Sequence, residues 1–256
     1  METIDRDIPG QVGFPAERLA RLADIEDSHF WFRGRQQVVD HLLLKYWSTD
    51  RPHVLDVGCG TASTVRRLAA SGVHVIGLDG RIEGLLGARA LVPRLPVAQA
   101  DAAHLPVKSG SQGTVIMLDV LEHVDDRQAL SEAGRVLGAG GLLVTTVPAI
   151  PALWSARDEA AGHLRRYTRT ALGAVLAGAG FTVLEVRYFQ CLLLPVLAAT
   201  RWLGRRKLSW RDVEDRPPRL VNAALGLISR LDAALGTRIP WPLGSSLVAV
   251  CRKGPA

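Results

Sequence analysis

Residues 53–62 constrain the fold of this chain more than any other stretch. They read His-Val-Leu-Asp-Val-Gly-Cys-Gly-Thr-Ala, an apolar strand that runs into a glycine-rich turn, and they predict a helix up to about residue 71. Gly58 and Gly60 let the backbone bend tightly and approach a ligand that any side chain would exclude. The helix would present unpaired N–H groups and the positive end of its dipole to that ligand.

The turn lacks the G-x-G-x-x-G spacing of dinucleotide-binding proteins, because Ser63 stands at the third glycine position. Instead, Asp56 lies two places before the first glycine. Its carboxylate would repel a pyrophosphate and attract a cation such as an ammonium group. The turn therefore favours a nucleoside ligand that carries positive charge, and it disfavours an NAD-dependent oxidoreductase.

Asp56-x-Gly58-x-Gly60-x-Ala62 resembles the first motif of the class I S-adenosylmethionine-dependent methyltransferases, whose usual form is acidic-x-Gly-x-Gly-x-Gly. Ala62 is a mild departure, at a position that serves close helix packing. The resemblance, to the small-molecule type of bacterial proteins, implies a Rossmann-like methyltransferase fold and S-adenosyl-L-methionine as cofactor. It implies that Gly58, Cys59 and Gly60 contact the cofactor, with Asp56 close to the methionine ammonium.

Strand and helix signals alternate through most of the chain, which predicts an α/β fold with a doubly wound, mostly parallel, seven-stranded sheet. Strands are expected at residues 54–57, 73–78, 96–100, 114–119, 141–147, 181–189 and 247–252. Helices are expected at residues 36–47, 62–70, 82–90 and 126–137, and after Thr168 as far as Gly178 or Gly180.

The pattern divides into four units. They are an N-terminal helical arm or cap at residues 1–50, a cofactor-binding core at 51–189, a helical insertion at 190–245, and a last core strand with a tail at 246–256. The arm is expected to contain a short amphipathic helix from residue 15. The insertion replaces the hairpin of a simple member of the fold and is predicted to be a substrate lid.

The amino-acid composition restricts the possible binding partners only slightly. The chain has 256 residues, of which 48% are hydrophobic, so it can bury a full core. Its formal net charge of +6 suits an anionic partner, a membrane surface, or solubility alone. Cys59, Cys191 and Cys251 form no C-x-x-C pair, so neither a disulfide framework nor a cysteine zinc site is expected.

The sequence predicts a cytoplasmic location. The acidic residues 1–5 lack the apolar core of a signal peptide, and Pro195 interrupts the most apolar window, residues 191–200. A basic run at residues 201–211 makes peripheral membrane contact through the insertion an open alternative.

Aspartates end the second and third predicted strands, as Asp79-Gly80 and Asp101-Ala102. Ligands of parallel sheets lie beyond the carboxyl ends of the strands, so Asp79 is expected beside the glycine turn, accepting from both ribose hydroxyls. The resemblance implies that Asp101 accepts from the adenine amino group and that the next backbone N–H, of Ala102, meets a ring nitrogen.

The fourth strand ends in Leu118-Asp119-Val120-Leu121-Glu122-His123, and the resemblance places Leu118 against the cofactor. Asp119, Glu122 and His123 share one face of a helical turn. With His163 they could bind a divalent ion; alternatively, His123 is a base or positions the substrate, or the group is structural. We take His123 as the candidate catalytic residue and keep the metal as the alternative.

Two clusters supply candidate substrate contacts. Trp31 lies in an aromatic run flanked by cations and could cover the sulfonium, while Arg35 could meet the cofactor carboxylate. After the fifth strand, polar and aromatic residues gather in a loop expected at the mouth of the site. This loop offers Trp154, His163, Arg166 and Tyr167. Alternatively, the aromatic residues around Trp31 serve only for packing, and the polar loop is an ordinary basic flank of the helix that follows it.

The function expected is methyl transfer to oxygen, nitrogen or carbon of a small, partly apolar molecule. The alternatives are an RNA or protein methyltransferase that docks through the basic insertion, and a binding module without turnover. Nucleic acid is disfavoured, because recognisable nucleic-acid modules and an Asn-Pro-Pro-Tyr motif are both absent from the sequence. The acceptor and the oligomeric state are left open.

Overall fold

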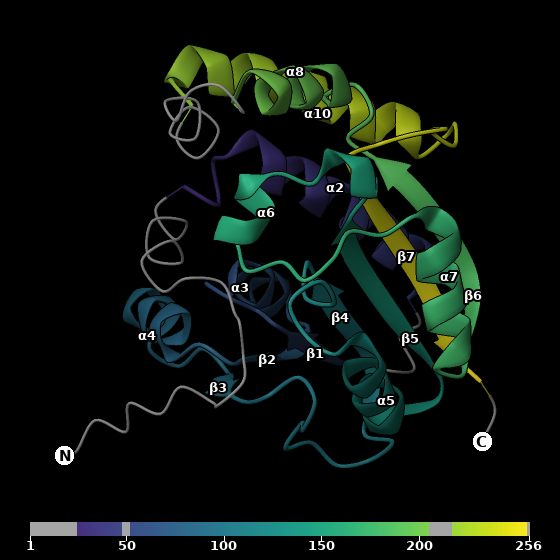
Figure 1. Ribbon diagram of the computed structural model, residues 1–256. Coiled ribbons are helices and arrows are strands. Elements are labelled where there is room, and N and C mark those ends of the chain that lie inside the picture. The colour runs from purple at the N-terminus through teal and green to yellow at the C-terminus, as the bar shows by residue number, and fades with distance from the viewer. Residues whose placement is uncertain (1–24, 48–51, 205–216, 255–256) are drawn as a thin grey trace.

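The computed structural model describes residues 25–47, 52–204 and 217–254. A seven-stranded sheet in the order β3-β2-β1-β4-β5-β7-β6 runs through its centre (Figure 1). Its strands are β1 (His53–Val57), β2 (His74–Asp79), β3 (Val97–Gln99), β4 (Gln112–Leu118), β5 (Leu137–Pro148), β6 (Phe181–Phe189) and β7 (Ser246–Lys253). The expected doubly wound, mostly parallel sheet is confirmed.

The last strand departs from the parallel arrangement. Strands β1 to β5 pair in parallel, whereas β7 is antiparallel to both β5 and β6. Because β7 lies between them, β6 runs in the same direction as β5. The chain therefore leaves β6 at the carboxyl edge of the sheet, where the turn after β1 also lies.

Helices cover both faces of the sheet. Helices α2 (Phe30–Tyr46), α3 (Ser63–Ala70) and α4 (Ile82–Leu91) pack on one face, and α5 (Asp126–Val136) and α7 (Arg169–Gly178) pack on the other. The alternation of side chains along a strand builds these two cores. On β1, buried Val54 packs in the core on the α2 side of the sheet, and its neighbour Leu55 packs in the core on the α5 side.

Helix α2 begins at Phe30 rather than at residue 36, so it contains the aromatic run. The reason is a local cap, because the His29 Nδ1 accepts a hydrogen bond from the Trp31 backbone N–H at 3.2 Å. The loop expected at 149–167 also contains helical turns, η1 (Pro151–Leu153) and α6 (Ala156–Ala160). The helix expected from residue 15 lies outside the described residues, which begin with a turn at residues 25–28.

Two helices of the insertion lie between β6 and β7, namely α8 (Leu194–Gly204) and α10 (Arg219–Gly236). Figure 1 shows both above α2, and α10 packs along that helix. Gly34 permits the close approach, because a Cβ atom there would overlap the Ser229 hydroxyl. Asn222 also links α10 to α2, because its side-chain oxygen accepts a hydrogen bond from the Phe30 N–H at 3.0 Å.

The side chains of the basic run at residues 201–211 lie outside the described part of the chain. Among the described helices, no segment combines the length and the apolar content needed to cross a membrane.

Candidate active site

A pocket of about 330 Å³ opens at the carboxyl ends of the parallel strands. Its lining comes from the start of α2, the glycine turn, the ends of β2 to β5, the loop between β5 and α7, and α8. Segments far apart in the sequence therefore meet at one edge of the sheet, as the topology predicts.

The glycine turn requires its glycines. Gly58 has φ +72° and Gly60 has φ +55°, in the left-handed region that glycine tolerates best. A Cβ atom on Gly58 would also collide with Val120, which follows β4. The backbone of the turn consequently lies bare at the pocket wall, and both glycines line it.

Backbone strain gathers around the same edge. Among the described non-glycine residues, four have φ +57°, and they follow the ends of β1, β4, β5 and β6. They are Ala62, Asp119, Ile150 and Gln190. Such conformations cost about 1–3 kcal/mol each and persist where a site requires them. The strain agrees with a functional edge.

Asp79 stands beside the turn, as its place at the end of β2 predicts. Its Oδ2 accepts from the Gly60 N–H at 2.7 Å, and its Oδ1 accepts from the Arg81 N–H at 2.8 Å. Burial raises the pKa of this carboxyl. Each carboxylate oxygen keeps a further lone pair for a ligand hydroxyl.

Asp56 lies behind the pocket lining and is only 3% exposed. Burial raises its pKa to about 7, while the positive charge of Arg35 opposes that shift. The negative charges of Asp79 and Glu26 add to the rise. A cation bound in the pocket would reverse these contributions and favour the ionised carboxylate.

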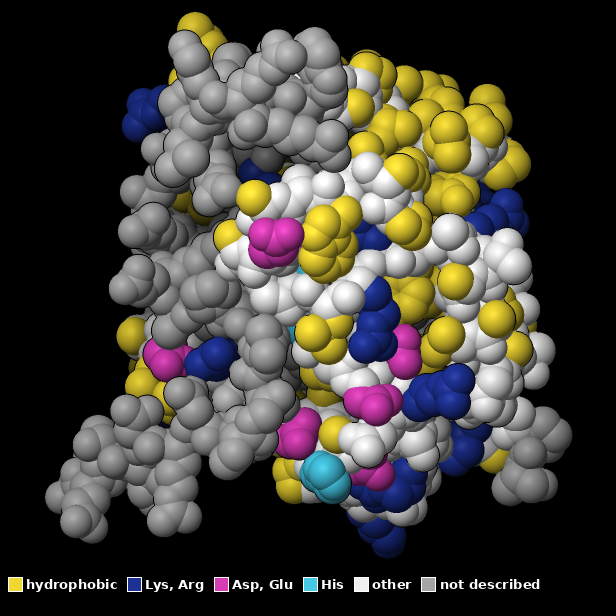
Figure 2. All heavy atoms as spheres, viewed as in Figure 1, with side chains coloured by type: hydrophobic (Ala, Val, Ile, Leu, Met, Phe, Trp, Pro, Cys, Tyr) yellow, Lys and Arg dark blue, Asp and Glu magenta, His cyan; other side chains and the backbone are white. Residues whose placement is uncertain are grey.

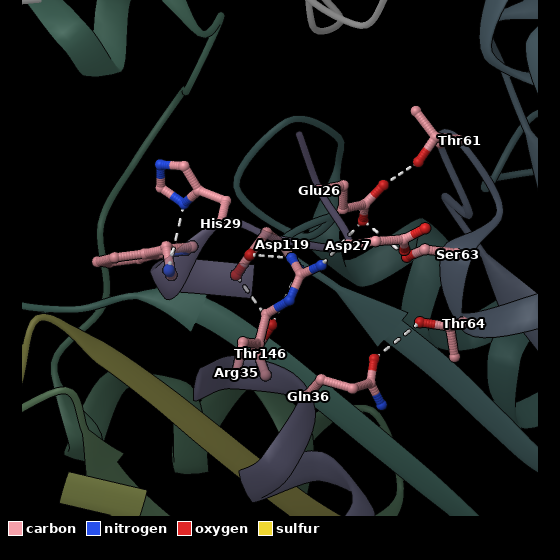
Figure 3. Close-up of polar contacts among 12 residues, drawn as sticks. Glu26, Asp27, His29, Arg35, Gln36, Thr61, Ser63, Thr64, Asp119 and Thr146 are labelled. Atoms are coloured by element: carbon pink, nitrogen blue, oxygen red, sulfur yellow. Dashed lines mark hydrogen bonds and ion pairs between the residues drawn. The ribbon is translucent and has the colours of Figure 1, made fainter. Parts of the chain in front are cut away.

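Arg35 reaches the pocket from α2 and forms an ion pair with Asp119. The Arg35 guanidinium donates to Asp119 Oδ2 at 2.6 Å, and Thr146 donates to the other oxygen at 2.9 Å (Figure 3). Burial alone would lower the pKa of Arg35, but Asp119 and Glu26 hold it above its ordinary value. Arg35 lines the pocket, so its guanidinium is accessible to the carboxylate of a bound ligand, as expected from the sequence.

Glu26 is a pocket residue that sequence reasoning missed. Its carboxylate accepts hydrogen bonds from the hydroxyls of Thr61 and Ser63, beside the glycine turn (Figure 3). An acid shortly before the aromatic run was the available signal, and it belongs to no motif. Glu26 increases the negative potential of this end of the pocket.

At the expected adenine end, Ala100, Ala102 and Leu118 line the pocket. Asp101 does not belong to the lining: its Oδ1 accepts from the Ala103 N–H at 2.9 Å, and its Oδ2 lies 3.2 Å from the His104 Nδ1. Its contact with an adenine amino group remains a prediction.

The loop after β5 brings some of the expected substrate-binding residues to the pocket, but not all of them. His163 and Arg166 line the pocket together with Trp31. Trp154 is outside the lining and donates to Glu159 at 3.3 Å. Tyr167 is also outside it, since its ring is buried in the core and its hydroxyl donates to Asp126 at 2.8 Å. The structure therefore does not bring Trp154 or Tyr167 to the pocket surface.

Glu122, His123 and His163 form a compact group on the pocket wall. One potential ligand atom from each lies within 4.8 Å of the others, and the two imidazole centroids are 4.8 Å apart. Glu122 is fully buried, and its pKa is well above the ordinary value because of burial and then the Asp119 charge. Asp119, the fourth member of the metal alternative, is held by Arg35 and Thr146 instead.

Comparisons with known proteins show what the chain is similar to. Residues 55–145 match a family model described as a methyltransferase domain. A "Probable S-adenosylmethionine-dependent methyltransferase" of Mycobacterium tuberculosis is 30% identical over 163 residues, 62% of this chain and 58% of the relative. A protein named in the same way from Mycolicibacterium smegmatis is 29% identical over 182 residues, 70% of this chain and 69% of the relative. The chain thus spans about three fifths of the first relative's length.

Solved structures share the fold. Haemonchus contortus phosphoethanolamine N-methyltransferase 2, in complex with S-adenosyl-L-methionine, superposes with a TM-score of 0.57 at 17% identity. The match covers 86% of this chain and 52% of the other. At that identity the likeness shows the fold alone. Motif, fold and relatives together support a class I S-adenosylmethionine-dependent methyltransferase with S-adenosylmethionine as its cofactor.

Proposed function

We propose that this chain transfers the methyl group of S-adenosylmethionine to a small, partly apolar acceptor. The observation that carries the proposal is one continuous pocket whose lining combines two kinds of residues. We assign the bare glycine turn with Asp79 to the cofactor end, and Trp31, Leu197 and the imidazole of His123 to the acceptor end.

The cofactor end fits each part of the ligand. Asp79 accepts from the ribose hydroxyls, and Ala102 and Leu118 contact the adenine. Arg35 pairs with the methionine carboxylate, and the negative potential of Asp56 favours the ammonium. The lining residues and the charges around them support these assignments.

The transfer itself needs little acid–base chemistry, because the sulfonium is already a good leaving group. The acceptor atom attacks the methyl carbon, the carbon–sulfur bond breaks, and S-adenosylhomocysteine leaves. A proton is lost from an oxygen or nitrogen acceptor, and His123 at the pocket wall takes it or orients the acceptor. Alignment of the two reactants contributes most of the acceleration.

The insertion acts as a lid over the acceptor end. Leu197 lines the pocket, and Leu193 packs behind it against Phe30. Val196 is 43% exposed to solvent, so not every apolar side chain of this segment faces the pocket. The polar contact from Gln190 to the Trp31 carbonyl, at 3.3 Å, holds the insertion against α2. Closure here would exclude water from the transfer site.

The same insertion presents an apolar face to solvent. Figure 2 shows hydrophobic side chains gathered where α8 and α10 lie. On α10 the buried positions include Ser229 and Asp232, whereas four of the five leucines are exposed and Leu225 packs against the cluster around Phe30. The exposed set comprises Leu220, Leu227, Leu231, Leu235, Ile239 and Leu243. This inverted pattern supports peripheral contact with an anionic membrane, because Arg219, Arg230 and Arg238 accompany the apolar stripe.

Vesicle sedimentation tests the membrane contact. Phosphatidylglycerol vesicles should retain the protein, and Leu227→Glu with Leu231→Glu should release it. Leu86→Glu is the matched control, since Leu86 is similarly exposed on α4, away from the stripe. Equal retention of both variants would contradict this contact.

The acceptor class is tested by incubating the protein with methyl-labelled cofactor and separate cell fractions. We expect label in the small-molecule or lipid fraction. Label confined to RNA or protein would promote the docking alternative, and cofactor binding without label in any fraction would favour a binding module.

A further inference from the structure

Glu122 is a buried acid on the pocket wall. Its side chain is fully buried, and neither carboxylate oxygen has a hydrogen-bond partner among the described residues. Buried polar atoms are nearly always paired, and leaving one unpaired costs stability. Two unpaired oxygens on one pocket residue therefore indicate a partner that binds from the pocket.

The two neighbouring imidazoles are oriented as metal ligands are. The His163 Nδ1 lies 3.0 Å from Asp158 Oδ1, and the His123 Nδ1 lies 3.3 Å from the Gly162 carbonyl. Where Nδ1 donates to such an oxygen, Nε2 is the atom that would bind a metal.

The residue behind His163 is itself fixed. Asp158 is 1% exposed, and it accepts from Arg166 Nε at 2.7 Å and from the Ser155 N–H at 2.9 Å. A buried carboxylate that orients a histidine is the usual support of a metal-ligating imidazole.

We propose that Glu122, His123 and His163 bind a divalent transition-metal ion on the acceptor side of the pocket. Two imidazoles and one carboxylate suit Zn²⁺, Mn²⁺ or Fe²⁺, whereas Mg²⁺ and Ca²⁺ prefer oxygen ligands throughout. Three protein ligands leave coordination positions for a further molecule. All three residues line the pocket, so those positions are reachable from it.

The catalytic consequence rests on the proposed function and narrows the acceptor to a hydroxyl compound. The acceptor oxygen would bind the metal, which lowers the pKa of the hydroxyl so that its proton leaves to solvent. The oxygen then attacks the methyl carbon as the carbon–sulfur bond breaks, giving a methyl ether and S-adenosylhomocysteine. In this arrangement His123 is a ligand and cannot also serve as the base.

Metal binding is measured on the chelator-treated full chain without cofactor, by calorimetry with Zn²⁺ and by visible absorption with Co²⁺. We expect one saturable site and intense Co²⁺ bands. Glu122→Gln and His163→Ala should each weaken binding by about 100-fold or more. His41→Ala should bind normally, because His41 is exposed on α2. Should Glu122→Gln fail to fold, the partly exposed His163 keeps the test available.

Other outcomes would overturn the proposal. One is the absence of saturable binding by the wild-type chain, and another is native affinity in His163→Ala. Loss of binding in His53→Ala instead would place the ion near the His53–His74 pair at the opposite end of β1 and β2. If the protein binds S-adenosylhomocysteine normally but has no metal site, this inference is wrong and the proposed function is unaffected. Failure to bind S-adenosylhomocysteine counts against the proposed function and leaves the metal site standing.

Discussion

The carboxylate of Asp79 accepts a hydrogen bond from the backbone N–H of Gly60 across 2.7 Å. This contact joins the end of β2 to the glycine turn after β1, and it positions the acid for the ribose before any ligand arrives. A preformed acceptor of this kind reduces the ordering that binding requires.

Asp79→Ala should therefore impair cofactor affinity far more than folding. Removing two charge-assisted hydrogen bonds to the ribose should cost about 2–4 kcal/mol of binding free energy. Calorimetric titration with S-adenosylhomocysteine measures the loss. Asp27→Ala is the control, because Asp27 is a surface acid that pairs with Arg66. Native affinity in Asp79→Ala would disprove the ribose assignment.

Cofactor affinity should rise with pH around neutrality. Burial raises the pKa of Asp56 to about 7, so the carboxyl is partly protonated there, and the ligand ammonium favours its ionised form. Titrations between about pH 6 and pH 8 should show this rise in the wild type and a flatter profile in Asp56→Asn. An identical profile in the variant would exclude Asp56 as the cause.

Stability should show the opposite trend at the same residue. The folded-state pKa of Asp56 exceeds its ordinary value, so the folded chain binds more protons and Asp56 destabilises it increasingly as pH rises toward 7. Asp56→Asn should consequently gain most in free energy of unfolding above pH 7 and least near pH 4. Urea denaturation at both pH values measures the difference, and an equal gain at both would contradict the raised pKa.

Gly58→Ala should reduce both stability and cofactor binding. The substitution forces a side chain into φ +72° and against Val120, at a cost of roughly 1–3 kcal/mol. Gly72→Ala provides a matched control, since Gly72 has φ +80° and open space around the position of a Cβ. The excess destabilisation of Gly58→Ala over Gly72→Ala measures the close contact. Equal losses would mean that the backbone angle alone matters.

Leu197→Gln should impair acceptor turnover and leave cofactor affinity near native, because Leu197 lines the pocket. Val196→Gln should behave like the wild type, since Val196 faces solvent. Methyl-labelling of the accepting fraction, with calorimetry for the cofactor, separates the two effects. Equal impairment by both substitutions would argue against Leu197 as a specific wall of the acceptor end.

The sheet and the cofactor edge could be predicted from sequence because their signals are local. Apolar runs mark the strands, and residues at strand ends such as Asp79 and Leu118 must meet at one edge in a parallel sheet. The turn after β1 needs glycine for steric reasons, and glycines at this spacing can be recognised in the sequence.

The acceptor side was less predictable, because loop side-chain directions depend on packing. Tyr167 and Arg166 are neighbours in sequence, yet one is buried in the core and the other lines the pocket. Glu26 reaches the turn through a tertiary contact that no spacing encodes. That the Glu122 carboxylate has no hydrogen-bond partner among the described residues becomes visible only once its surroundings are known.

Calorimetric titration of the purified chain with S-adenosylmethionine, S-adenosylhomocysteine and NAD tests the central claim most directly. The acidic residue before a turn without dinucleotide spacing predicts saturable binding of both sulfur compounds and no heat with NAD. Saturation by NAD, with no heat from S-adenosylhomocysteine, would contradict the account.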